Sequence, residues 1–209
     1  MKAYLAKQSL GTLDRNGKFY AAGKQVQKAV LRGETVYRIR RNLALNATVL
    51  AYNKNYPTYE KYGPQHAFDG KMSDPEADKW HASGVNGWVA FDIHTLVANP
   101  ILKIYHGGYV EADQSLNTYS WDVYILNETY MTEEGFFNLP ASSQKRVCNI
   151  AWYWKKIHVT NGNTVDISVD RIDMPEARRL FKINMRKTNQ TGQPYYLNIY
   201  EIEMYESDY

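Results

Sequence analysis

The chain is short of cysteine, since Cys148 is the single one among 209 residues. One cysteine cannot form an internal disulfide, so a disulfide-stapled scaffold is excluded, although secretion is not. No activating motif surrounds Cys148, which argues against a catalytic thiol. A chain of this length buries a sizeable core without such staples.

Other features are missing as well. The sequence has no apolar run of about 20 residues, so it predicts no membrane-spanning helix. Its first residues contain no signal-peptide core, which indicates either a cytoplasmic protein or a piece of a larger chain. The net charge is +3 and the cations are spread along the chain, so no basic run predicts nucleic-acid binding. No nucleophile motif, phosphate loop or His-rich metal signature is present, and we expect no catalytic activity.

Tyrosine is abundant, with 18 Tyr beside 5 Trp and 6 Phe. Aromatic residues favour strands. They also favour binding surfaces, because a Tyr or Trp ring joins an apolar face to a polar group. For any single Tyr, however, packing in a core or across strands is the stronger interpretation.

The sequence reads as short strands and long turns with almost no helical periodicity. The expected strands are residues 47–52, 87–93, 100–106, 119–126, 180–185 and 197–205. Residues 131–137 are expected to form a helical turn. Strands at this spacing indicate an all-β sandwich.

Residues 1–41 differ from the rest of the chain. Asn16-Gly17 predicts a hairpin turn, and residues 33–40 predict a strand. Forty residues are too few to hold a core alone. We therefore interpret 1–41 as an N-terminal β-extension or the end of a preceding domain, and 42–209 as the main domain.

An acidic loop between residues 67 and 81 is the most informative stretch. Asp69, Asp74, Glu76 and Asp78 follow one another there, around the turn residue Gly70. Calcium takes six to eight oxygen ligands at about 2.3–2.6 Å, from carboxylates and backbone carbonyls. The pattern therefore favours a calcium site, although it is not an EF-hand and an ordinary acidic surface loop is the alternative.

The last expected strand carries two acidic residues, Glu201 and Glu203, on one face because side chains alternate along a strand. If that face is the core, a buried Glu201 needs a partner. A calcium ion held by the Asp69 loop would be such a partner. The alternative is two solvent-facing glutamates on an edge strand.

Several blocks occur in the order typical of a known family. Over about residues 42–206 the chain resembles the coagulation factor 5/8 type C, or discoidin-like, domain, which overlaps carbohydrate-binding module family 32. Residues 106–108 and 116–118 are most similar to modules attached to bacterial endo-β-N-acetylglucosaminidases, and residues 33–39 resemble the last strand of an immunoglobulin-like domain. The blocks that carry the family resemblance are residues 42–47, 67–70, 79–81, 87–93, 119–124, 162–164, 177–183 and 200–205.

The resemblance implies a jelly-roll β-sandwich of the galactose-binding-domain-like type, with one structural calcium ion. The ligands that it implies are the carbonyls of His66, Lys71 and Tyr200 and the side chains of Asp69 and Glu201. One further ligand stays open: counting forward from Asp69 gives Asp74, and counting back from Trp80 gives Asp78. We favour Asp78, because Trp80 is the better fixed point.

In the family that the chain resembles, sugars bind loops at one end of the sandwich. Such a site needs an aromatic face under the sugar ring and planar polar groups for its hydroxyls. The three adjacent aromatics at 152–154 cannot all face one core, so at least one should reach solvent. For Trp80, Trp88 and Trp121 core packing is the stronger interpretation. The predicted sugar contacts are Tyr52, Tyr59, His81, His106, Tyr109, Glu111, Asn117, Trp152 and Trp154.

The resemblance thus predicts a non-catalytic carbohydrate-binding module of a larger, secreted or surface-bound bacterial glycosidase. Its partners would be neighbouring domains and glycans with a terminal galactose, N-acetylhexosamine or mannose-type residue. Two alternatives stay open: a discoidin-type adhesion or protein-interaction module, and an architectural domain that braces a neighbouring catalytic domain.

Overall fold

The computed structural model contains two compact units, Met1–Arg41 and Asn42–Tyr209. Side chains are described only in the second unit. In the first unit the structure describes the backbone of residues 2–5, 8–13, 19–21, 24–25, 28–31 and 34–38. Beyond it the structure describes residues 41–53, 62–72, 78–83, 86–107, 120–161, 167–186 and 196–207.

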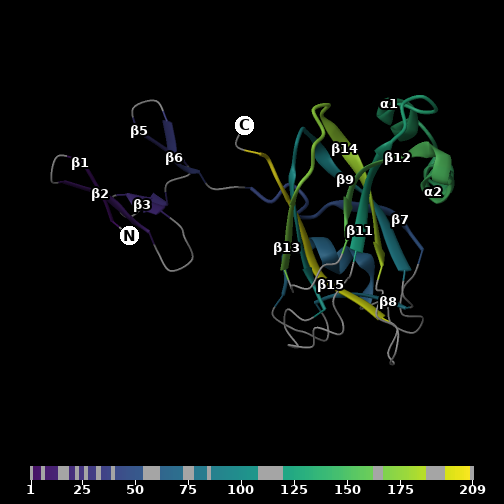
Figure 1. Cartoon of the computed structure of the whole chain (residues 1–209), viewed down its shortest axis with the longest axis horizontal. Coiled ribbons are helices and arrows are strands. Elements are labelled where there is room, and N and C mark those ends of the chain that lie inside the picture. Colours follow the sequence, from purple (N-terminus) through teal and green to yellow (C-terminus); the bar gives the residue numbers. More distant parts are fainter. Residues whose placement is uncertain are drawn as a thin grey trace. The chain divides into compact units, whose positions relative to one another are not determined.

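The first unit is built from short antiparallel strands (Figure 1). One sheet has the order β1 (Lys2–Leu5), β2 (Gln8–Leu13), β3 (Phe19–Ala21) and β4 (Lys24–Gln25). A second pair consists of β5 (Lys28–Leu31) and β6 (Glu34–Arg38). Strands β2 and β3 pair on either side of Asn16-Gly17, although these two residues lie outside the described part. The strand predicted at 33–40 is confirmed as β6.

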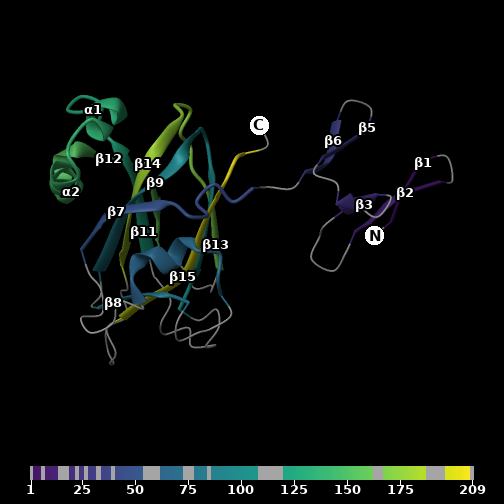
Figure 2. The same cartoon turned by 180° about the vertical axis from the view of Figure 1, so that it is seen from behind.

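The second unit is a sandwich of two antiparallel sheets (Figures 1 and 2). The larger sheet has the order β12 (Trp154–Thr160), β11 (Ser120–Leu126), β14 (Arg178–Arg186), β9 (Asn86–Val97) and β7 (Thr48–Tyr52). The smaller sheet has the order β13 (Ile167–Arg171), β10 (Ile101–His106), β15 (Tyr196–Tyr205) and β8 (Trp80–Ser83). The predicted all-β sandwich is therefore confirmed.

The main core lies between the two sheets. Inward residues alternate with outward ones along each strand, so Phe91 and Phe181 meet at 6.1 Å between ring centroids. Phe68, from the short 3₁₀ helix η2 (Pro64–Phe68), packs against Phe91 at 4.6 Å. Trp80 and Trp121 are fully buried in this cluster, which confirms their predicted role as core residues.

A second apolar cluster covers part of the outer face of the five-stranded sheet. It joins Leu180 and Ala90, from the sheet, to Phe136 and Val147 from two helices. These are α1 (Glu133–Phe137), which confirms the predicted helical turn, and α2 (Ala141–Asn149), which the sequence did not predict. Both helices lie together at one end of the sandwich (Figures 1 and 2). No helix in the described part of the chain has the length and apolar character needed to cross a bilayer.

The strand directions define two ends of the sandwich. At the helix end, beside α1 and α2, Leu126 ends β11 and pairs with Trp154, the first residue of β12. Strand β9 also finishes there, and three residues separate it from the start of β10. At the opposite end, which we call the loop end, β10 stops at His106 and β11 begins at Ser120.

Candidate functional site

The acidic loop meets the last strand of the sandwich, although the two are far apart in sequence. The Gly70 N–H donates a hydrogen bond to Glu201 Oε2 at 3.0 Å, 131 residues away. Gly70 has a φ of +71°, and a Cβ there would lie 2.9 Å from Leu45 Cδ1. Glycine is therefore needed at this turn. The structure thus brings together the two segments that supply the predicted metal ligands.

Glu201 lies in an environment that disfavours a negative charge. Its side chain is fully buried, and Oε1 has no hydrogen-bond partner. Burial, together with the nearby carboxylates of Asp69 and Glu203, raises the pKa of Glu201 to about 8, although the Gly70 N–H opposes this shift. A buried carboxylate of this kind is stabilised by an adjacent cation.

Asp69 is fixed beside this glutamate by local bonds. Its Oδ1 accepts a hydrogen bond from the Lys71 N–H at 2.9 Å, and its Oδ2 lies 3.1 Å from His66 Nδ1. Asp78 is described and partly buried, whereas Asp74 lies outside the described residues, so the open choice between them stays a prediction.

The predicted metal ligands fit a hard cation. Asp69 and Glu201, with the carbonyls of His66, Lys71 and Tyr200, would supply an all-oxygen donor set of the kind that calcium prefers. Within the described residues no group of three or more His, Cys, Asp or Glu side chains could hold a metal ion. Backbone carbonyls would therefore have to complete the coordination, as the resemblance implies. The orphaned Oε1 of Glu201 is the structural observation that favours this fit.

Two predicted sugar contacts lie in strands that run to or near the loop end. Tyr52 is the last residue of β7 and is 44% exposed. His81, in β8, is partly exposed, and its ring lies 5.6 Å from that of Tyr62. The predicted contacts that lie outside the described residues are Tyr59, Tyr109, Glu111 and Asn117.

Two other predicted contacts are interior residues. His106 is fully buried, its Nε2 lies 2.8 Å from Ser168 Oγ, and its ring lies 6.0 Å from that of Trp121. The Trp154 indole N–H donates to the Val147 carbonyl at 3.3 Å inside the second cluster. Neither side chain offers an open face to a sugar, because both are buried.

Trp152 also departs from the predicted arrangement. It is 62% exposed, which confirms that one ring of the 152–154 triplet reaches solvent. However, it lies in the 3₁₀ helix η4 (Ala151–Tyr153), just before β12 and hence at the helix end. Trp152 and Tyr52 therefore lie toward opposite ends of the sandwich.

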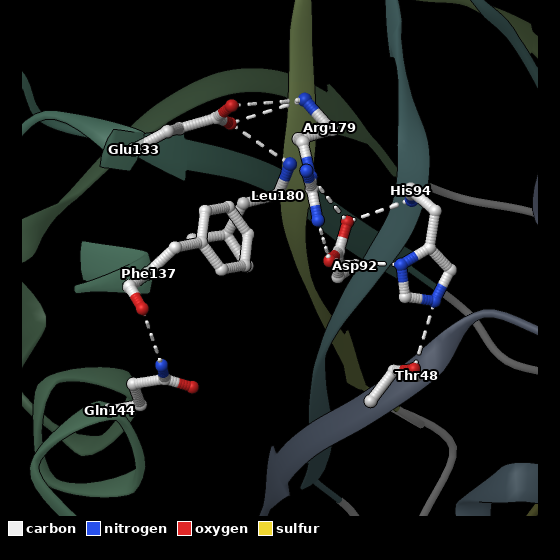
Figure 3. Close-up of polar contacts among 8 residues, drawn as sticks. All are labelled: Thr48, Asp92, His94, Glu133, Phe137, Gln144, Arg179 and Leu180. Carbon is white, nitrogen blue, oxygen red and sulfur yellow. Dashed lines mark hydrogen bonds and ion pairs between the residues drawn. The ribbon is translucent and has the colours of Figure 1, made fainter. Parts of the chain in front are cut away.

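A polar cluster at the helix end was not predicted (Figure 3). The Arg179 guanidinium pairs with Asp92, whose Oδ2 also lies 3.2 Å from His94 Nδ1. His94 Nε2 in turn lies 2.9 Å from Thr48 Oγ1. The hydroxyl, imidazole and carboxylate stand in the order used by hydrolases, but the Arg179 ion pair already engages Asp92.

This cluster holds an irregular part of β9 in place. Asp92 pairs with Leu180 but Val97 pairs with Arg178, so β9 contains extra residues between them. His94 has a φ of 61° in this stretch, and its N–H donates to Asp92 Oδ1 at 2.8 Å. No local pattern indicated the cluster, because Asp92 and Arg179 are 87 residues apart.

Comparison with known proteins shows the fold. No family model matches the chain, and no curated protein sequence matches it. Among solved structures, the chain is similar to the family 32 carbohydrate-binding module of Streptococcus pneumoniae EndoD, with 19% identity and a TM-score of 0.60. The match covers 80% of this chain and 100% of that chain.

Two further similar structures are also modules named for binding a saccharide. Chitosan-binding module 1 of a chitosanase/glucanase from Paenibacillus sp. IK-5 matches with 15% identity, a TM-score of 0.50, and coverage of 79% of this chain and 98% of that chain. A Streptococcus pneumoniae fucose-binding module matches with 15% identity, a TM-score of 0.50, and coverage of 80% and 96%. The chain therefore has the discoidin-like fold of family 32 carbohydrate-binding modules.

Proposed function

We propose that this chain is a non-catalytic carbohydrate-binding module. The carrying observation is that its sandwich matches the full length of a family 32 carbohydrate-binding module. Other neighbours are named for binding fucose, chitosan and the Lewis b antigen. Burial raises the pKa of the Cys148 thiol to about 11, so this cysteine stays protonated at neutral pH and is a poor nucleophile.

The sugar site of this proposal lies at the loop end. Tyr52 and His81 offer there what a sugar needs, an exposed ring and a polar heterocycle. The ligand would be a terminal galactose, N-acetylhexosamine or mannose-type residue. A shallow site with so few anchors should bind weakly, with a Kd of about 0.01–1 mM.

A structural calcium ion belongs to the same proposal. The carboxylates of Asp69 and Glu201, the carbonyls of His66, Lys71 and Tyr200, and a carboxylate from Asp78 or Asp74 would hold it. The ion would supply positive charge to the buried Glu201 and would tie the acidic loop to β15.

The module would act as part of a larger secreted or surface-bound bacterial glycosidase. Weak binding to a glycan raises the local concentration of an attached enzyme on its substrate. The strands of residues 1–41 are consistent with a neighbouring domain in such a chain. They equally suit an architectural role, in which the sandwich braces a catalytic neighbour and binds no sugar.

Glycan binding can be tested with a matched pair of tyrosine variants. Titration calorimetry with galactose, N-acetylglucosamine, fucose and mannose should identify one sugar that binds. Tyr52→Ala should weaken that binding about tenfold or more, because it removes the stacking face. Tyr130→Ala removes another exposed tyrosine, at the helix end, and should leave binding unchanged. Failure of every sugar to bind, or equal losses in both variants, would favour the architectural role.

A further inference from the structure

The outer face of the five-stranded sheet carries an organised group of polar and aromatic side chains that the proposed function does not use. Pairing places Asp122, Asn184 and Trp88 in one row across three strands. The next row contains Tyr124 and Lys182, with Lys156 opposite Tyr124 on β12. These residues and Arg186 alternate with the core residues of the same strands, so they face away from the sandwich. We call this set the basic face.

A buried carboxylate organises the cations of the basic face. The side chain of Asp122 is 1% exposed, and its Oδ2 lies 2.9 Å from Lys156 Nζ. Its Oδ1 lies 3.3 Å from Arg186 Nη2, while Arg186 Nε donates to Ser120 Oγ at 3.2 Å. Two cations thus share one carboxylate, and their own side chains remain 43% and 39% exposed. The arrangement keeps both positive groups in fixed positions at the surface.

Aromatic rings lie beside these cations. Lys156 Nζ is 5.6 Å from the Tyr124 ring centroid, and the Tyr124 hydroxyl donates to Asp122 Oδ2 at 3.2 Å. Lys182 Nζ lies 4.2 Å from the Trp88 ring centroid and donates to the Cys148 carbonyl at 2.8 Å. Trp88 and Tyr124 are half-buried beside the second apolar cluster, so Lys156 and Arg186 supply the exposed groups of this face. Cations held in place beside aromatic rings are groups that recognise a saccharide bearing negative charge.

The charge of the whole sheet points to the same class of ligand. The acids in its strands are Asp92 and Asp122, and each is already paired with a cation. The cations in its strands are Lys155, Lys156, Arg178, Arg179, Lys182 and Arg186. Arg178 is paired with Glu128 and Glu176 outside the sheet, but the remaining cations still leave the strands with an excess of positive charge.

The dimensions suit a chain of sugars rather than a small ion. Strands lie about 4.8 Å apart, so the four strands from β12 to β9 span about 14 Å. Arg186 retains further N–H donors beyond the two that bond Ser120 and Asp122, and a guanidinium matches a carboxylate or sulfate in a two-point contact.

We propose that the basic face is a second saccharide-binding surface, formed by other side chains than the loop-end site, and that it takes an anionic glycan whose carboxylate or sulfate lies against Arg186 and Lys156. The inference rests on the proposed function in that both concern glycans, but it uses different side chains, from β14 and β12 rather than from β7 and β8. Binding at both places would let one module contact two parts of a glycan.

The test uses the full chain and three oligosaccharides of similar length. A hyaluronan hexasaccharide carries carboxylates, a chondroitin sulfate hexasaccharide adds sulfates, and a chitin hexasaccharide is neutral. We expect the unmodified chain to bind one or both anionic probes in calorimetry at 50 mM NaCl. Raising the salt to 300 mM should weaken that binding several-fold, because exposed charges are screened.

Variants then locate the binding. Arg186→Gln should weaken the anionic probe about tenfold, because a charge-assisted contact is lost. Asp122 keeps Lys156 and the Tyr124 hydroxyl in this variant, so the fold should survive, which a thermal melt checks. Lys156→Gln is the second variant. Arg171→Gln removes the same charge from an exposed position in β13 of the other sheet and should change nothing.

Distinct results bear on the two proposals. Absence of anionic binding, or equal losses in Arg186→Gln and Arg171→Gln, would overturn the inference. A poly-glutamate peptide that binds as tightly as the anionic saccharides would also overturn it, since the face would then recognise charge alone. Loss of anionic binding in Arg186→Gln with neutral-sugar binding intact supports both proposals. Selective anionic binding without any neutral-sugar binding supports this inference and counts against the loop-end site.

Discussion

The two sheets of the sandwich carry opposite kinds of charge. The strands of the four-stranded sheet contain the acids Asp170, Glu201 and Glu203 against the cations Lys103 and Arg171. Its most notable charge, Glu201, is buried, whereas Lys156 and Arg186 of the five-stranded sheet reach the surface. A buried acid calls for a bound cation, and exposed cations attract an anion. The four-stranded sheet thus buries its most notable charge, whereas the five-stranded sheet presents two cations to solvent.

Removal of calcium should produce the largest loss of stability, because the ion would bind a strand of the four-stranded sheet. An ion at 1,000 times its Kd contributes about 4 kcal/mol of stability, which excess EDTA would abolish. Thermal unfolding with calcium and then with EDTA measures the difference. An unchanged melting temperature would mean that Asp69 and Glu201 bind no calcium and belong to an ordinary acidic loop and strand.

Two glutamate variants sharpen this test. Glu201→Gln should make the melting temperature insensitive to EDTA, because a ligand is lost. In EDTA it should be at least as stable as the unmodified chain, since burial already raises the pKa of Glu201 to about 8. Glu203→Gln, two residues along the same strand, should keep the full EDTA effect. A similar response in both variants would contradict the predicted coordination.

Truncation of Glu133 should have the next largest effect on stability, because it weakens contacts of the five-stranded sheet. Its carboxylate accepts hydrogen bonds from the Leu180 N–H at 2.9 Å and the Arg179 N–H at 3.2 Å (Figure 3). Glu133→Ala leaves both N–H groups unsatisfied and should cost about 2–3 kcal/mol, measured by urea denaturation. Glu134→Ala, at an exposed position of the same helix, is the control and should cost little.

The pH dependence of this contact has a definite sign. Burial is the main cause that raises the pKa of Glu133 above its ordinary value of 4.5. The folded state then binds more protons than the unfolded state. The contribution of Glu133 to the free energy of unfolding is therefore fully present below pH 4.5. It is lost as the pH rises through the higher pKa of the folded state. Relative to Glu133→Gln, the stability of the unmodified chain should fall over that range. A constant difference between pH 4 and about pH 7 would refute this.

Asp122→Asn should destabilise the five-stranded sheet by a smaller amount. Lys156 and Arg186 both lose their negative partner, but their exposed side chains can turn to solvent. We expect a loss of about 1–2 kcal/mol in chemical denaturation. Asp173→Asn, at an exposed position outside the strands, should be neutral. A loss above that of Glu133→Ala would mean that the cations are held much more firmly than their exposure indicates.

Gly70→Ala should destabilise the protein by an amount similar to that of Asp122→Asn, and it returns to the four-stranded sheet. The positive φ of Gly70 makes a side chain unfavourable by about 1–2 kcal/mol. The added Cβ would also lie 2.9 Å from Leu45 Cδ1. The double variant Leu45→Ala/Gly70→Ala should relieve that contact but not the backbone strain, which a melting curve can separate. Full recovery in the double variant would show that crowding, not φ, is responsible.

The sequence was informative about the inner strands, whose alternation is strong. Strands β9, β10, β11, β14 and β15 all lie within predicted segments or overlap them. Strands β12 and β13 were missed because they are sheet edges with mostly exposed or half-buried residues, so their apolar alternation is weak. Helix α2 was missed because Val147 and Cys148 are its only buried residues.

Sites were harder to predict than strands. The contact of the Asp69 loop with Glu201 could be predicted, because the motif resemblance supplied a pairing across 131 residues. The ion pairs of Asp92 with Arg179 and of Asp122 with Arg186 could not be predicted, because no local spacing identifies partners more than 60 residues apart. His106 illustrates the opposite error, because a histidine at a strand end gives no sign of whether it faces the core.

Strand β15 is the last in chain order among the described strands, yet it occupies the interior of its sheet, between β10 and β8. During synthesis on a ribosome, the smaller sheet therefore stays divided into β13–β10 and an isolated β8 until residues 196–205 have emerged. Met204 also exchanges hydrogen bonds with Asn42 and Leu43, at the opposite end of the same unit. A nascent chain should consequently gain protease resistance in one late step rather than gradually, and a polypeptide released before residue 196 should be open to degradation.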